Sequence, residues 1–157
     1  MDSIVYSPVG LIHLIFSILA MIFGAWVIFN KKGSKRHKQV GYAYAISMIG
    51  VIVTAFMIYR LFKGWGIFHY MAVVSSVTLI LGMLPAMLRK PKDNWAGLHI
   101  GFMYWSVVGL YAAFISEVLT RAPWSNMKLF LVILMSFFAL CSFLFNRNMK
   151  RWTAQFS

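Results

Sequence analysis

The sequence predicts an all-α integral membrane protein, a five-helix transmembrane bundle that forms a single transmembrane domain over residues 1–157. The chain is 61% hydrophobic and 11% charged, and its mean hydropathy is +0.77. Soluble domains carry about 25% charged residues. Because about 20 apolar residues cross the hydrocarbon core as a helix, the five long apolar stretches of the chain are expected to span a bilayer.

The five helices are expected, in chain order, at residues 9–29, 40–62, 67–88, 97–119 and 129–145. The first begins after Met1-Asp2-Ser3, which lacks the basic segment of a signal peptide, so we expect it to be retained. Pro85 and Pro91 flank the expected end of the third helix, and Pro123 follows the fourth. The fifth apolar stretch is the shortest of the five. The connections between the stretches are short, so the predicted helices leave no room for a water-soluble domain.

The basic residues are distributed unevenly between the two expected faces of the membrane. The first connection, the third connection and the C-terminal tail hold Lys31, Lys32, Lys35, Arg36, Lys38, Arg89, Lys90, Lys92, Arg147, Lys150 and Arg151. The other two connections hold only Arg60, Lys63, Arg121 and Lys128. The positive-inside rule therefore predicts the N-terminus outside and the C-terminus in the cytoplasm. The net charge of +12 is explained by anionic lipid head groups and not by nucleic acid.

Cysteine chemistry is excluded by the count. Cys141 is the only cysteine and lies inside the fifth apolar stretch. The chain therefore has neither an internal disulfide nor a metal site built from several cysteines.

The four histidines are the main candidates for function. His13, His37, His69 and His99 each lie near the start of a separate apolar stretch, where an ionisable side chain is costly. The predicted topology divides them into an outer pair, His13 with His69, and an inner pair, His37 with His99. His37 lies within a basic run, so the sequence leaves open whether it faces the bundle or water.

Two helix faces add polar or small residues to this pattern. His99 and Glu117 are 18 residues apart, or five helical turns, and Ser106 lies close to the same line. This stripe is expected to face other helices. In the first helix, Ser17, Ala20 and Gly24 follow His13 and form a small-residue face, which fits close helix packing or a flat cofactor.

One interpretation of the histidines is b-type haem. Bis-histidine ligation needs two imidazoles from facing helices at similar depth. An outer haem on His13 and His69 and an inner haem on His37 and His99 would provide a two-step electron path across the bilayer. This order of ligands over the first four helices resembles that of the transmembrane ascorbate-dependent b-type cytochromes.

A second interpretation is a metal or proton site at the outer face. His13, His69 and Glu117 are expected at similar depth, and two histidines with a carboxylate can bind zinc and leave a position for water. Such a site would suit a membrane hydrolase or a transporter. Alternatively, Glu117 pairs with Arg121 four residues later, as is common on helices.

A third interpretation is structural. The chain would then be an accessory subunit of a membrane complex without a cofactor, and its histidines would only form hydrogen bonds between helices.

The sequence also resembles a bacterial family of multi-pass membrane proteins known only as a domain of unknown function. The resemblance rests on the segment Arg36-His37-Lys38-Gln39-Val40-Gly41-Tyr42, on Phe68-His69, and on a pattern in the fourth helix made of His99, Met103, Ser106, Gly109, Leu110, Ala112, Ala113, Glu117, Arg121 and Pro123. It implies a protein of the bacterial inner membrane and no established activity. Taken together, the sequence predicts a haem-binding electron-transfer protein, with a quinone, another membrane protein or a second copy of the chain as candidate partners.

Overall fold

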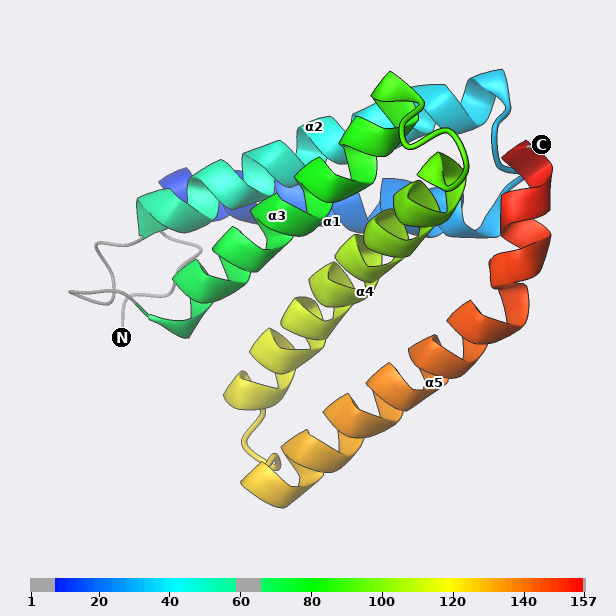
Figure 1. Ribbon diagram of the computed structural model, residues 1–157. Helices are drawn as coiled ribbons and strands as arrows, with labels where there is room; N and C mark the ends of the chain where they lie inside the picture. Colours follow the sequence, from blue (N-terminus) through cyan, green and yellow to red (C-terminus); the bar gives the residue numbers. More distant parts are fainter. Residues whose placement is uncertain (1–7, 59–65, 157) are drawn as a thin grey trace.

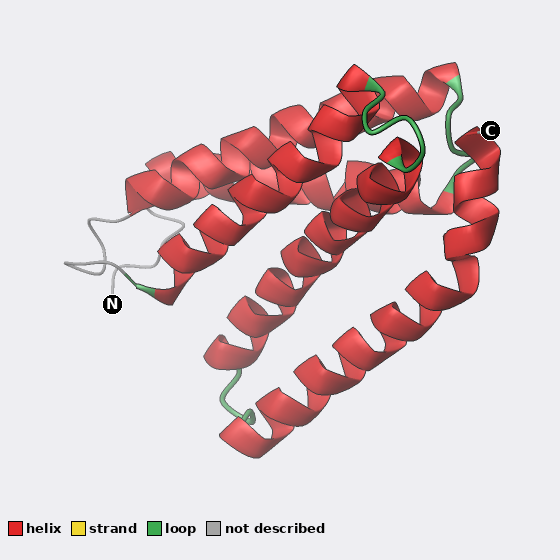
Figure 2. Ribbon diagram, in the orientation of Figure 1, coloured by secondary structure: helices red, strands yellow, loops and turns green. Residues whose placement is uncertain are grey.

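The computed structural model describes residues 8–58 and 66–156, and within them the chain is helical. Five long helices follow one another and end in a short 3-10 helix (Figures 1 and 2): α1 Pro8–Phe29, α2 Lys35–Met57, α3 Ile67–Leu88, α4 Trp95–Arg121, α5 Met127–Thr153 and η3 Ala154–Phe156. Each of the five is long and apolar enough to cross a membrane. The predicted all-α architecture of five candidate spans is confirmed.

Several helix boundaries differ from the prediction, and two of the largest differences are at the start of α2 and the end of α5. Helix α2 begins at Lys35, five residues before the apolar stretch, because the Ser34 side chain caps it by accepting a hydrogen bond from the His37 amide. Helix α5 has 27 residues and continues to Thr153, because its polar last turns stay helical although they end the hydropathy signal. Residues 59–62 of the predicted second helix, with Arg60, and Lys63 after it lie outside the described residues.

Helix α4 is the centre of the arrangement. It packs against α1, α3 and α5, while α1 lies along α2, and α5 runs beside α4 at the margin of the bundle (Figure 1). The end of the bundle where α1 ends and α2 and α4 begin also holds the C-terminus (Figure 1). We call this the basic end, because it contains Lys31, Lys32, Lys35 and Arg36.

The core is formed by α1, α2, α3 and α4, and it includes a buried polar contact. Tyr44 and Ala20 are fully buried, and the Tyr44 hydroxyl forms a 2.8 Å hydrogen bond with the Ser106 hydroxyl. A Cβ at Gly24 would lie 3.1 Å from the Tyr44 ring and from Val107. The small-residue face of the first helix is therefore used for close helix packing.

Apolar side chains cover the outside of the bundle. Large hydrophobic residues are exposed on all five helices, for example Ile22, Ile46, Ile80, Phe114 and Met135. A soluble monomer rarely exposes apolar surface on this scale. The bundle is therefore suited to a lipid environment.

Candidate functional site

The structure brings the two predicted inner ligands together. The rings of His37 on α2 and His99 on α4 lie 6.3 Å apart between centroids, with their planes at 87°. Because α2 starts at Lys35, His37 belongs to its first turn and is only 6% exposed. His37 faces the bundle, which answers the question that its basic neighbours left open.

Hydrogen bonding distinguishes the nitrogens of the two rings. His99 Nδ1 is 2.7 Å from the Gly82 carbonyl oxygen on α3. A carbonyl only accepts, so this nitrogen carries the proton and Nε2 keeps its lone pair, an arrangement typical of metal-ligating histidines. His37 Nδ1 is buried and has no hydrogen-bond partner among the described residues. A buried imidazole nitrogen in this state is suited to an additional ligand.

The C-terminal 3-10 helix covers this pair. The Phe156 ring lies 5.9 Å from the ring of His37 and 5.9 Å from that of His99, and it also contacts Trp95 at 5.3 Å. The Gln155 side chain accepts a 2.7 Å hydrogen bond from the Lys32 amide. The cavity beside the two histidines has a volume of about 40 Å³.

Lys32, in the connection between α1 and α2, is a buried cation beside this site. It is 6% exposed, and its ammonium group donates hydrogen bonds to the carbonyl groups of Val27, Ile28 and Asn30 at the end of α1. Its Nζ lies 5.1 Å from the centre of the Trp152 ring. Burial lowers the pKa of Lys32 to about 8, while the carbonyls at the helix C-terminus stabilise its positive charge.

This pKa gives a testable pH dependence. Between pH 8 and 10.5, the unfolded chain binds a proton at Lys32 that the folded chain releases, so the contribution of Lys32 to stability should rise with pH in this window. Replacing Lys32 by methionine keeps the apolar stem and removes the charge. Thermal unfolding in detergent at several pH values should show the wild type gaining stability relative to K32M as the pH rises. A constant difference would show that Lys32 keeps its ordinary pKa.

The predicted outer ligands lie at the opposite end of the bundle. His13 Nδ1 on α1 forms a 2.8 Å hydrogen bond with the Thr54 hydroxyl. His69 is 2% exposed at the start of α3, and its Nδ1 accepts a 3.1 Å hydrogen bond from the Gly66 amide. Its ring lies 6.2 Å from that of Phe56. Both histidines therefore contact the last turns of α2.

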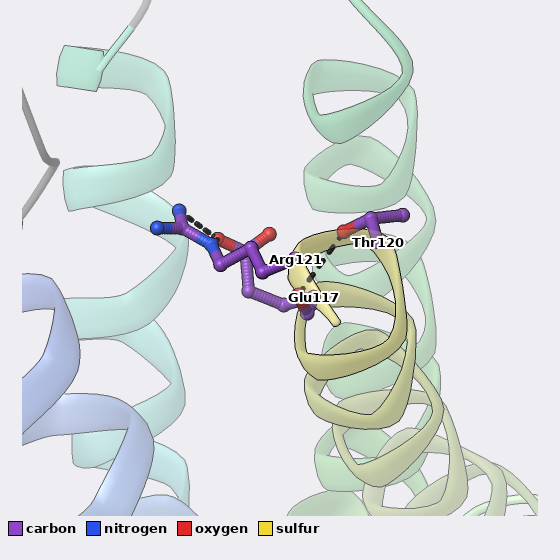
Figure 3. A network of polar contacts seen from close by, with 3 residues as sticks. All are labelled: Glu117, Thr120 and Arg121. Atoms are coloured by element: carbon purple, nitrogen blue, oxygen red, sulfur yellow. Dashed lines mark hydrogen bonds and ion pairs between the residues drawn. The ribbon is translucent and has the colours of Figure 1, made fainter. Parts of the chain in front are cut away.

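Glu117 makes a local ion pair. Its carboxylate accepts hydrogen bonds from Arg121 Nε, at 2.8 Å, and from an Arg121 terminal nitrogen (Figure 3). The Glu117 side chain is 37% exposed. Of the predicted polar stripe on α4, His99 and Ser106 thus bond to other helices, whereas Glu117 bonds to its own.

The outer metal interpretation gains no geometric support from this arrangement. Over residues 8–58 and 66–156, no three histidine, cysteine or acidic side chains form a group that could hold a metal ion. The structure therefore does not bring His13, His69 and Glu117 together as a three-ligand site.

Sequence reasoning missed Phe156, Lys32 and Gly82 as parts of the inner site. The hydropathy pattern gave no signal for Phe156, because this residue lies beyond the apolar part of α5. Lys32 could not be distinguished from the many other basic residues, and Gly82 takes part through its backbone carbonyl, which every residue has.

No family model, no curated protein and no solved structure matches the chain. The two resemblances described above therefore stay predictions.

Proposed function

We propose that this protein is a membrane electron carrier in which His37 and His99 would hold a b-type haem near the cytoplasmic face. The observation that supports this most directly is the 6.3 Å separation of their rings. With metal–imidazole bonds of about 2.0 Å, two imidazoles on opposite sides of one metal ion have centroids about 6 Å apart. Haem bound there would supply a one-electron iron couple.

The chain's own residues would have separate tasks. The Gly82 carbonyl holds the His99 ring in one tautomer through its 2.7 Å hydrogen bond. Lys32 interacts electrostatically with His37 and provides positive charge for an anionic cofactor. Before a cofactor enters, Phe156 of the C-terminal helix η3 covers the pair.

The volume of the site sets a condition on this proposal. A cavity of about 40 Å³ is far below the roughly 300–1,000 Å³ of typical cofactor pockets. Haem binding therefore requires Phe156, which contacts both imidazoles, to move away. Phe156 lies in η3, which is three residues long, and its movement would also break the contact of its ring with Trp95 on α4.

Orientation and partners are part of the same proposal. The excess of lysine and arginine at the basic end supports a cytoplasmic location for that end and for the C-terminus, in a bacterial inner membrane. His13 and His69, at the other end, would ligate a second haem, and a quinol or an external donor would supply electrons.

The test is the haem content of the full chain, purified in detergent from cells supplied with a haem precursor. A Soret band and a pyridine haemochrome signal of one haem per chain are expected for the inner site alone, and two if the outer site is also filled. Absence of both signals would exclude the electron-carrier function.

The small cavity favours one second candidate, a single transition-metal ion held by the same two imidazoles. Elemental analysis of the same preparation separates the two. Stoichiometric metal without porphyrin would support the second candidate and contradict the first.

A further inference from the structure

A large groove lies between α1, α4 and α5 and borders the cavity beside the histidines, with which it shares the lining residues Ile28, Tyr104, Val107 and Trp152. Its volume is about 880 Å³. It lies beside α5, which packs mainly against α4 and makes few contacts with α1. The groove is therefore open toward the surroundings of the bundle, where lipid would lie.

The lining of the groove changes from apolar to polar along α5. Its inner part is formed by Val108, Phe137, Cys141 and Leu144. The part at the basic end is formed by Asn30, Lys31, Asn148, Arg151 and Gln155. The groove thus has the polarity of an amphiphile, with a long apolar section below a cationic end.

Within residues 8–58 and 66–156, Lys31 and Arg151 form no ion pair with a carboxylate. The chain has 15 lysines and arginines but only 3 acidic residues, and the ion pair found in the described residues joins Glu117 to Arg121. Lys31 and Arg151 are both exposed. Both cations are therefore accessible to an anionic group from outside the described part of the chain.

We propose that the groove binds one anionic phospholipid, with its phosphate at Lys31 and Arg151 and an acyl chain along Val108, Phe137 and Leu144. Basic pockets between transmembrane helices on the cytoplasmic side are suited to anionic head groups. A volume of about 880 Å³ lies within the usual range of small-molecule sites, roughly 300–1,000 Å³. A neutral quinone would leave both cations uncompensated. The inference does not depend on the haem.

The experiment compares lipid classes on the full chain. The protein is reconstituted in nanodiscs of equal amounts of phosphatidylglycerol and phosphatidylcholine, released into detergent, and analysed by native mass spectrometry. We expect the wild type to retain one phosphatidylglycerol. Since each basic residue near the surface contributes about fivefold to anionic lipid binding, K31Q/R151Q should lower the preference for phosphatidylglycerol by about 25-fold.

Two further variants locate the effect. K35Q/R147Q removes the same charge from exposed positions outside the groove lining and should retain the lipid. Leu144→Trp keeps all charges and fills the apolar section, so it should lose the lipid. The proposal is overturned if both double variants lose the lipid equally or if L144W retains it. It is also overturned if phosphatidylcholine and phosphatidylglycerol are retained equally well, or if a quinone or a second copy of the chain fills the groove.

Discussion

Replacing His37 or His99 by alanine should remove the inner haem. Each variant lacks one of the two histidines that would hold the haem, and even loss of a group that only orients a metal ligand lowers affinity by about 10–100-fold. If the inner site is the only haem site, we therefore expect the haem content per chain to fall at least about tenfold. If a second haem stays on His13 and His69, the total haem content per chain should fall by about half. The measurement is the pyridine haemochrome assay per chain, with circular dichroism to check that the helices are intact.

The matched control is Gln39→Ala, which changes an exposed residue in the first turns of the same helix. It should keep its haem. If H37A and H99A retain the haem content of Q39A, these two histidines are not ligands and the electron-carrier proposal fails at this site.

Phe156→Ala tests the condition that the cavity imposes. The Phe156 ring contacts both imidazoles, so its removal should ease haem entry and raise haem affinity in titrations of the apoprotein. A lower affinity than the wild type would show that Phe156 holds the site together and does not obstruct it.

The second large effect is expected at Gly50 in α2. A Cβ there would lie 2.5 Å from the ring of Phe16 on α1, closer than carbon atoms can approach. Gly50→Ala should therefore force α1 and α2 apart and destabilise the protein by about 2 kcal/mol, as overpacking does in tight cores. Thermal unfolding in detergent, followed by circular dichroism, measures this change.

Gly41, in the same helix, provides the control. A Cβ at Gly41 would have no neighbour within 4 Å. Gly41→Ala should be neutral or stabilising by up to about 1 kcal/mol, because alanine favours helix more than glycine does. Equal losses at both positions would indicate that helix propensity, and not the contact with Phe16, sets the stability.

The fold was largely predictable from the sequence because membrane helices follow from length and apolarity. The boundaries of the third helix agree with the prediction, and those of the first differ by one residue. Errors arose where the chain stays helical beyond its apolar part, at Lys35 and after Phe145. There a capping bond at Ser34 and the packing of Trp152 and Phe156 decide the structure.

The candidate site was predictable as a set of residues and not as a geometry. The sequence placed His13 and His69 in apolar helices with Glu117 expected at similar depth, and it left open whether His37 faces the bundle or water. The structure instead brings the rings of His37 and His99 together and joins Glu117 to Arg121. The sequence did indicate that Glu117 could pair with Arg121 four residues later. Whether Glu117 bonds to Arg121 or reaches toward His13 and His69 depends on the direction of its side chain, which the spacing of residues along the chain does not give.

The sequence alone thus determined five apolar helices and four histidines divided between the two ends of the bundle, since both follow from composition and order along one chain. Only the tertiary structure decided that His37 is buried, that Phe156 covers it, and that a groove opens between α1 and α5. These features depend on contacts between residues about 55 to more than 100 positions apart, and hydropathy, which averages over neighbours in the chain, contains no information about them.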